Sequence, residues 1–325
     1  MFHNHFVCRI IFPALLVAFA SGCSGGKPAE TPAENTAAQS APKVFTIGMS
    51  QCNLGEPWRV QMNHDIAEAA KNHPALRVIF KDAQNQTTVQ QNHVQEFISQ
   101  GVDLIIVSPL EAAPLTGPVA EAYERGIPVI VLDRAVLGDK FAMFIGAANT
   151  LIGEAAGRWV VEKLGGEGKI VELKGLMTST PGQDRHTGFR KGIEGSGIEV
   201  VFEADMRWLQ PNAQSEMESA LTRCPEIDLV YAHNDPGAYG AYLAAKAAGR
   251  EKDIIFVGID GLPQEGLAYV EQGILDVTFE YPTGGAEAIE YAVKILAGEE
   301  VPKNLVLPSR FYTKENLADG GEWLE

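Results

Sequence analysis

The chain has 325 residues, enough for two domains that each bury a hydrophobic core. Hydrophobic residues make up 46% of it and charged residues 21%, the ordinary composition of a globular protein. The formal net charge of −16 would repel nucleic-acid phosphates, which argues against DNA or RNA as a partner.

The chain begins with an apolar segment that predicts export. Residues 6–20 are strongly apolar, with Arg9 as their only charge, and Pro13 interrupts a run that is short for a membrane span. We interpret residues 1–22 as a signal peptide. Ala20-Ser21-Gly22-Cys23 resembles a bacterial lipobox, which predicts a lipid anchor on Cys23, with cleavage without lipidation as the alternative.

The next segment predicts a tether. Residues 23–42 are Gly, Pro, Ala, Thr, Ser, Glu and Gln almost throughout, and no apolar periodicity allows them to pack. A disordered tether directly after a lipidation site is typical of a receptor anchored in the periplasm or at the outer face of the cell membrane.

From residue 43 onwards, short β-branched runs alternate with longer segments of helical periodicity. The strands expected in the first half are residues 44–48, 78–80, 104–107 and 129–132, and the helices are residues 58–72, 89–99 and 118–125. This β-α-β-α order predicts an α/β fold with a parallel, doubly wound sheet.

The strand pattern then repeats at one nearly constant offset. Residues 170–173, 200–205, 227–231 and 255–260 echo the four strands of the first half in order. Four matching strand pairs predict two similar lobes, with chance similarity of apolar strands as the alternative. Ligands of open parallel sheets bind beyond the carboxyl ends of the strands, so two facing lobes predict a cleft between them.

Polar residues that follow the strands predict what the cleft binds. Sugars offer hydroxyl groups and an apolar ring face, which are recognised by carboxylates, Arg, Asn and aromatic rings. Asp133 and Arg134 directly follow an apolar strand. A buried ion pair is costly unless its bonds are satisfied, so we expect this pair to contact the ligand, with a purely structural pair as the alternative.

The second half offers an amide and a carboxylate in equivalent positions. Asn234 could contact hydroxyl groups or cap the helix expected near Pro236. We assign the cap to Asp235, which leaves Asn234 for the ligand. Asp260 ends a strand before Gly261 and is equivalent to Asp133, so we expect a ligand carboxylate rather than a turn residue.

Aromatic and arginine side chains complete the predicted site. Trp58 and Arg59 begin the first helix, and Trp208 follows a strand of the second half, so both indoles are candidates for stacking on a sugar ring. Arg185 is expected just before a helix that begins near Thr187, where the alternative is a solvated side chain.

Several of these segments together resemble the ribose/galactose-type periplasmic sugar-binding proteins of ABC transporters. They are Ile47 to Gln51 with Trp58-Arg59, Pro128 to Arg134, Glu172 to Gly175, Arg185 to Phe189, Tyr231 to Asp235 and Val257 to Gly261. The resemblance covers residues 44–312, and the first and fifth segments are most similar to the galactofuranose-binding branch.

The resemblance implies a fold of the type I periplasmic binding protein class, with two lobes joined by three hinge crossovers. The crossovers are expected near Ala147, Glu280 and Pro308. The N-terminal lobe would comprise residues 43–147 and 281–307, with a helix at 285–296, and the C-terminal lobe residues 148–280 and 308–325.

The resemblance also implies a set of ligand-binding residues. They are Glu56, Trp58, Arg59, Asp133, Arg134, Arg185, Trp208, Asn234, Asp260 and Glu280. Met206 competes with Trp208 for its place in the alignment. The ribose pattern has two aromatic residues where this chain has Trp58 and Arg59, which argues against ribose and for a galactofuranose-like sugar or another hexose or pentose.

We therefore expect a monomeric solute-binding lipoprotein that delivers a monosaccharide to an ABC permease in the membrane, without a cofactor. A sensory receptor for a chemotaxis or kinase partner is the alternative. An enzyme acting on glycosides is a distant third, because the carboxylates have no evident nucleophile–base pair. The export signal excludes a transcriptional regulator. In addition, no helix-turn-helix segment is found before residue 43.

The cysteines and histidines predict neither a disulfide nor a metal. Cys52 and Cys224 could pair in an oxidising compartment, but we expect them in different lobes, where a disulfide would prevent hinge motion. No His or Cys spacing typical of a metal site is present in the sequence.

Overall fold

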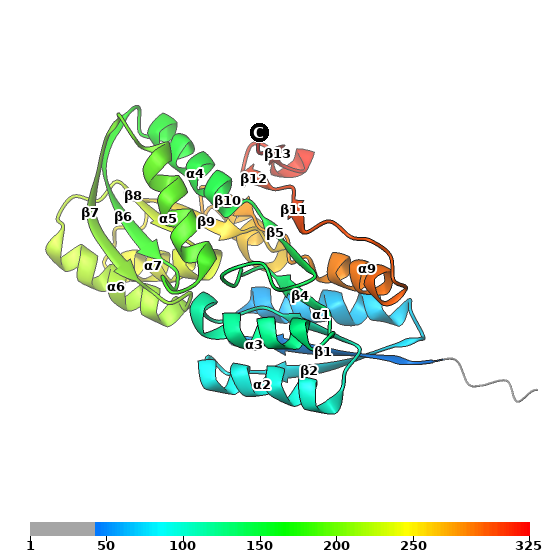
Figure 1. Cartoon of the computed structure of the whole chain (residues 1–325). Coiled ribbons are helices and arrows are strands. Elements are labelled where there is room, and N and C mark those ends of the chain that lie inside the picture. Colours follow the sequence, from blue (N-terminus) through cyan, green and yellow to red (C-terminus); the bar gives the residue numbers. More distant parts are fainter. Residues whose placement is uncertain (1–42) are drawn as a thin grey trace, which may run out of the picture. The chain divides into compact units, whose positions relative to one another are not determined.

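Residues 43–325 are the part of the chain that the structure, a computed structural model, describes (Figure 1). The predicted signal peptide, the lipidation site at Cys23 and the tether lie outside these described residues. Within 43–325, no helix combines the length and the apolarity needed to cross a bilayer.

The first sheet is six-stranded and forms the N-terminal lobe. Its order is β2-β1-β3-β4-β5-β11, and all five neighbouring pairs are parallel. The strands are β1 (Phe45–Gln51), β2 (Leu76–Asp82), β3 (Leu104–Val107), β4 (Val129–Leu132), β5 (Met143–Ala147) and β11 (Asn304–Leu307).

Helices cover both faces of this sheet, which explains the uninterrupted apolar strands in its centre. The helices are α1 (Pro57–Lys71), α2 (Thr87–Gln100), α3 (Ala112–Glu124) and α9 (Gly285–Leu296). Leu104 and Ile106 of β3 pack in the cluster under α1 and α9, whereas Ile105 and Val107 pack in the cluster under α2 and α3. Successive side chains of a strand point to opposite faces, so every residue of β3 is buried.

The second sheet is seven-stranded and forms the C-terminal lobe, in the order β7-β6-β8-β9-β10-β12-β13. The strands are β6 (Glu167–Lys174), β7 (Gly197–Asp205), β8 (Leu229–Ala232), β9 (Ile255–Asp260), β10 (Val277–Glu280), β12 (Arg310–Thr313) and β13 (Glu322–Trp323). The helices are α4 (Asn149–Lys163), α5 (Thr180–Gly192), α6 (Gln210–Arg223), α7 (Asp235–Ala247) and α8 (Ala268–Glu271), with a π turn at Pro263–Leu267 and a 3₁₀ turn at Leu317–Asp319.

The two sheets confirm the internal repeat. The order β2-β1-β3-β4-β5 in one lobe is matched by β7-β6-β8-β9-β10 in the other. Each strand pair that shares the sequence offset therefore occupies equivalent places in the two sheets. The predicted α/β class with two doubly wound lobes is correct.

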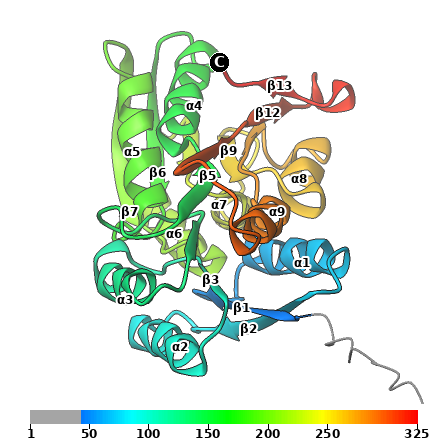
Figure 2. The ribbon, with the colours of Figure 1, turned by 45° about the vertical axis from the view of Figure 1, so that its right-hand side comes forward.

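The chain crosses between the lobes three times. Helix α4 follows β5 of the first sheet but packs against α5 of the second lobe, and α9 follows β10 of the second sheet but packs against α1 of the first (Figure 2). The third crossing lies between β11 and β12. The lobes thus exchange one helix each at these crossovers.

Helix α3 begins at Ala112, six residues before the start expected at Pro118. Proline inside a helix removes a backbone hydrogen bond to the carbonyl four residues earlier, here that of Pro114. The Gln91 side chain of α2 donates to this carbonyl at 2.8 Å. A contact from another helix thus compensates for the missing bond.

Helix α5 begins at Thr180, well before the expected start near Thr187, so Arg185 lies inside the helix and not ahead of it. Pro181 stands in the first turn, where its fixed φ angle suits a helix and its missing N–H costs nothing. Residues 180–186, expected ahead of the helix, are therefore its first turns.

The cysteines of the described residues, Cys52 and Cys224, are both free and lie in different lobes. Cys52 directly follows β1 and is buried, and Cys224 directly follows α6.

Helices α4 and α5 cross at very short range through glycines from both helices. A Cβ atom at Gly188 would collide with the backbone oxygen of Thr150, and one at Gly153 with the backbone oxygen of Arg185. The crossing matters for the cleft because these two helices carry Asn149 and Arg185.

We predict that Gly188→Ala lowers the free energy of unfolding by about 1–3 kcal/mol, because the added methyl group pushes α4 and α5 apart. Urea unfolding followed by circular dichroism measures this. Gly55→Ala is the matched control, since its Cβ would meet only the Asn53 side chain at an ordinary 3.6 Å. Equal stability of the two variants would contradict the tight crossing.

Candidate functional site

The carboxyl ends of the strands in both lobes meet at one cavity. It is lined by Glu56, Trp58, Arg59, Asp133, Pro181, Arg185, Trp208, Asn234, Asp260 and Tyr281. The structure thus brings eight of the ten residues predicted for ligand binding together. Arg134 is buried beside the cavity, and Glu280 points elsewhere.

The cavity residues occupy positions that follow from the fold. Asp133 directly follows β4, Asn234 lies two residues after β8, and Asp260 is the last residue of β9. Trp58 and Arg59 stand in the first turn of α1, which follows β1. In parallel sheets all these positions lie at the same edge.

Asp133 is the centre of a charge cluster in the N-terminal lobe. Its Oδ2 accepts from Arg59 Nη1 at 2.5 Å and from Ser108 Oγ at 3.2 Å. Arg134 Nε is more distant, at 3.8 Å. Burial alone would raise the pKa of the Asp133 carboxyl, but Arg59 and Arg134 more than offset this and hold the pKa below its usual value.

Asp133 is therefore paired more closely with Arg59 than with its neighbour Arg134. The Arg134 side chain is 1% exposed, and its Nη1 donates to the carbonyl of Leu110 at 3.1 Å. Among the described residues, its Nε and Nη2 have no hydrogen-bond partner. Its guanidinium carbon lies 5.6 Å from the ring of Trp208.

Arg185 organises the C-terminal side of the cavity. Its Nε donates to Asn149 Oδ1 at 2.9 Å, and its Nη1 donates to the backbone oxygen of His233. The same guanidinium lies 3.6 Å from Asp260 Oδ1. Arg185 is only 3% exposed, so the expectation of a cleft residue rather than a solvated one agrees with its placement.

The assignment of the helix cap to Asp235 is wrong. Asn234 has the extended backbone of an N-cap, and its Oδ1 accepts from the backbone N–H of Gly237 at 3.0 Å. Its Nδ2 donates to the backbone oxygen of Trp208 at 3.0 Å. Asn234 thus lines the cavity and caps α7 as well.

Asp235 stands one residue further on, in the first turn of α7, and has a different task. Its carboxylate accepts from the backbone N–H of Gly261 at 2.8 Å and from Thr278 Oγ1 at 2.7 Å. It is fully buried and ties α7 to the ends of β9 and β10.

Two indoles stand at the cavity, one from each lobe. Trp58 Nε1 donates to the backbone oxygen of Tyr281 at 2.8 Å. Trp208 has a left-handed backbone with φ of 69°, and its ring lies over Gly175, where any side chain would collide with it. Met206 belongs to the core of the C-terminal lobe, so Trp208 and not Met206 is the cavity residue.

Glu280 does not line the cavity, contrary to the expectation from the resemblance. Its carboxylate accepts from Tyr312 Oη at 3.4 Å and lies 3.9 Å from Arg310 Nε, both on β12. Neighbouring residues of a strand point in opposite directions. The next residue, Tyr281, faces the cavity instead, and sequence reasoning missed it.

A second buried network of hydrogen bonds is centred on Glu172 in the C-terminal lobe. Glu172 is fully buried, and its Oε1 lies 2.8 Å from His186 Nδ1 and 3.2 Å from His233 Nε2. Burial would raise the pKa of Glu172, but the hydrogen bonds with these histidines outweigh it, and the pKa falls to about 2. His233 Nδ1 accepts from the backbone N–H of Gly175.

The atoms of Glu172, His186 and Glu203 are close enough to ligate a metal ion. However, Arg190 Nη2 lies 2.8 Å from Glu172 and 2.6 Å from Glu203. A guanidinium already neutralises these carboxylates, so the cluster is an ion-pair network.

Three acidic groups near the cavity resist ionisation. Burial raises the pKa of Asp260 well above its usual value, although Arg185 partly opposes this. Burial also raises the pKa of Asp235 to about 6, and burial together with the charge of Asp235 raises that of Glu265 to about 7. A protonated carboxyl at Asp260 both donates and accepts hydrogen bonds, as a hydroxyl group does.

The cavity is nearly closed in this conformation. Its free volume is about 20 Å³, roughly the space of one water molecule. A larger ligand fits only after the lobes move apart or the lining side chains rotate.

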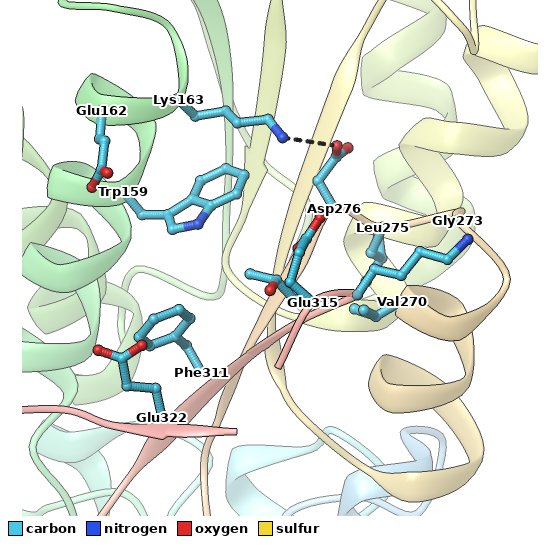
Figure 3. A pocket seen from close by; sticks show the side chains of 12 residues that line it. Trp159, Glu162, Lys163, Val270, Gly273, Leu275, Asp276, Phe311, Glu315 and Glu322 are labelled. Carbon is cyan, nitrogen blue, oxygen red and sulfur yellow. Dashed lines mark ion pairs between the residues drawn. The ribbon is translucent and has the colours of Figure 1, made fainter. Parts of the chain in front are cut away.

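A wider hollow lies on the C-terminal lobe away from the cavity (Figure 3). The end of α4, the segment after α8 and strands β12 and β13 surround it, and the Lys163–Asp276 ion pair at 3.7 Å spans it. None of the residues predicted for ligand binding lies there.

Residues 47–300 match the periplasmic binding protein domain family. The chain belongs to this family. Among its relatives, the ribose import binding protein of Bacillus subtilis is 32% identical over 275 residues, which cover 84% of this chain and 88% of that protein. The galactofuranose-binding protein of Escherichia coli is 33% identical over 230 residues, 67% of this chain and 72% of that protein.

Solved structures show the same relationship. The fructose-binding periplasmic domain of a hybrid two-component system matches with a TM-score of 0.82 and 44% identity, covering 85% of this chain and 92% of that one. The chain is thus a member of the sugar-binding periplasmic proteins, which bind substrates and are not enzymes. The resemblance noted from the sequence is confirmed.

The raised pKa values of Asp235 and Glu265 predict how stability depends on pH. Both groups hold protons more tightly in the folded chain than in the unfolded one, where values near 3.8 and 4.5 apply. Their stabilisation is complete below about pH 4 and is lost as the pH rises to about 7. Thermal unfolding should therefore show a higher Tm at pH 5 than at pH 8.

Glu265→Gln isolates one of these groups, because the variant cannot ionise. It should raise the Tm at pH 8 and leave it nearly unchanged at pH 5. Glu300→Gln, at an exposed position, serves as the control and should follow the wild type at both pH values. If Glu265→Gln showed the same pH dependence of the Tm as the wild type, Glu265 would not contribute to that dependence.

Proposed function

We propose that the chain binds one monosaccharide in the cavity between its lobes and delivers it to an ABC importer. The observation that supports this most strongly is the composition of the cavity wall. Arg59 and Asp133 face it from one lobe, Arg185, Asn234 and Asp260 face it from the other, and an indole accompanies each group. Hydroxyl groups need such mixed donors and acceptors, and sugar rings need aromatic faces.

Unpaired donors favour the same class of ligand. Among the described residues, Arg59 Nε, Arg134 Nε and Nη2, and Trp208 Nε1 are buried without a hydrogen-bond partner. Buried donors without partners are costly, so a ligand with several oxygen acceptors would stabilise the closed lobes.

The sugar we propose is a hexose in its furanose form, with fructose as the first to test. The solved fructose-binding domain is more similar to this chain, at 44% identity, than the ribose- and galactofuranose-binding relatives at 32% and 33%. Ribose is a poorer candidate, because Arg59 at the start of α1 stands where the ribose pattern has a second aromatic residue.

A sensory role is the second candidate function. The same fructose-binding domain belongs to a hybrid two-component system, which favours a partner that reads the closed form rather than one that transports sugar. Both roles use the same cavity, so they differ only in the partner.

We also propose that Cys23 carries a lipid after cleavage of residues 1–22, and that residues 23–42 tether the lobes to the membrane. The support is the sequence alone. Mass spectrometry of the mature chain from membranes, with Cys23→Ser as the control, tests this proposal.

Calorimetric titration of residues 43–325 against a panel of monosaccharides tests the ligand. The panel includes fructose, galactose, arabinose and ribose. Fructose is expected to release heat and to raise the Tm, because binding to the folded form stabilises it. Absence of heat with every sugar would refute monosaccharide binding.

Asp133→Asn should weaken sugar binding by at least about tenfold, because it removes the charge that holds Arg59 in place. Glu56→Gln changes a more weakly paired carboxylate, 3.7 Å from Arg59 Nε, and should weaken binding less. Calorimetry measures both, with circular dichroism to show that each variant folds. Wild-type affinity in Asp133→Asn would remove this carboxylate from the site.

Deletion of the gene separates the two roles. An importer component is required for uptake of the radiolabelled sugar, whereas a sensor is required only for the transcriptional response to it. Normal uptake in the deletion strain together with a lost response would replace the importer with the sensor.

A further inference from the structure

Tyr281 occupies a place in the fold that no other cavity residue shares. It follows β10 of the C-terminal lobe and precedes α9, which packs on the N-terminal lobe, so it lies in a crossover. Its side chain is 2% exposed and lines the cavity. A residue in a hinge that also faces the ligand is in a position to link ligand binding to lobe motion.

The phenol of Tyr281 joins two crossovers to the charge cluster. Its hydroxyl group donates to the backbone oxygen of Asp133 at 3.2 Å and accepts from Asn149 Nδ2 at 3.3 Å. Asn149 is the first residue of α4, directly after the crossover from β5. One hydroxyl group therefore contacts the N-terminal lobe at Asp133 and the C-terminal lobe at Asn149.

The remaining atoms of Tyr281 also contact both lobes. Its carbonyl accepts from Trp58 Nε1 at 2.8 Å, and its backbone N–H donates to the carbonyl of Asp260 at 3.0 Å. The guanidinium of Arg185 lies over its ring, 4.7 Å from the centroid. Four cavity residues are thus held by this single residue.

Asn149 extends the connection, because its Oδ1 accepts from Arg185 Nε while its Nδ2 donates to Tyr281. A chain of three bonds leads from Arg185 through Asn149 and Tyr281 to Asp133. The two bonds of the Tyr281 hydroxyl group require donor–acceptor distances near 3 Å, so a displacement of about 1 Å between the lobes breaks at least one of them.

We propose that Tyr281 is a positioning residue that holds Asp133 and Arg185 in register across the hinge, so that the lobes close with both sides of the cavity correctly aligned. The inference rests on the proposed function only in its statement about sugar affinity. The connection between the lobes exists in the chain itself and can be tested without any sugar.

Tyr281→Phe removes the hydroxyl group and keeps the ring against Trp58 and Arg185. We expect it to weaken binding of the sugar identified by calorimetry by about five- to a hundredfold, the equivalent of the two hydrogen bonds that the hydroxyl group makes. The loss should appear as faster dissociation with an unchanged association rate in stopped-flow measurements, because the closed form is destabilised.

Lobe closure is measured directly with spin labels on both rims of the cleft. Gln86 and Thr178 are exposed and lie in different lobes, so Gln86→Cys and Thr178→Cys accept labels in a Cys224→Ser background. Without sugar, Tyr281→Phe should shift the distance distribution from double electron–electron resonance towards longer distances. Saturating sugar should restore the short distance.

Tyr312→Phe is the matched control. Tyr312 is also buried, and its hydroxyl group donates to Glu280, but both residues lie in strands of the C-terminal sheet. This variant should leave affinity and closure unchanged. Unaltered distances and affinity in Tyr281→Phe would overturn the proposal, as would equal effects of the two variants.

A double-mutant cycle gives an independent test. If Tyr281 and Asn149 act through their shared bond, Tyr281→Phe and Asn149→Ala should shift the label distances by less in combination than the sum of their separate shifts. Additive shifts would contradict the connection. If the wild type binds no sugar, the monosaccharide proposal fails, whereas the label distances still decide the role of Tyr281.

Discussion

Every ion pair at the cavity lies within one lobe, and the rest of the structure depends on this constraint. Asp133 is paired with Arg59 inside the N-terminal lobe, and Asp260 lies beside Arg185 inside the C-terminal lobe. None of the ion pairs described within residues 43–325 joins one lobe to the other. Separating a buried ion pair is costly, so a cleft whose ion pairs stay within their lobes can open without breaking any of them.

The repeat and the strand ends are the features that the sequence predicts well. Apolar runs identify the buried strands, and the fold brings the residues that follow them to one edge, so Asp133, Asn234 and Asp260 could be placed near one another. Helix starts were predicted less well. Proline signals a break by itself, whereas in α3 the Gln91 side chain of another helix satisfies the carbonyl that Pro118 leaves free.

The predicted site was wrong in two situations. In one, a single residue has two structural roles; in the other, a shift of one residue along the chain reverses the direction of the side chain. Asn234 caps α7 with its oxygen and contacts the Trp208 backbone with its nitrogen. It lines the cavity while it serves as the cap, so the cap did not have to be assigned to another residue. Glu280 and Tyr281 are neighbours, but only Tyr281 faces the cavity. Its partners lie in three distant segments, and no local pattern in the sequence reveals such long-range contacts.

Because none of the described ion pairs joins the lobes, the closed form is held by hydrogen bonds between neutral groups and by the contact of the Arg134 guanidinium with the Trp208 ring. The hydroxyl group of Tyr281 makes one such hydrogen bond, and the backbone bond between Ala112 and Thr178 at 3.3 Å is another. Neutral hydrogen bonds contribute about 0.5–1.5 kcal/mol each, so a few of them leave opening within reach of thermal motion. Under the proposed function, the sugar accepts hydrogen bonds from the unpaired nitrogens of Arg59 and Arg134 on one side and of Trp208 on the other. The ligand then decides which conformation prevails, because it binds the closed form more tightly than the open one.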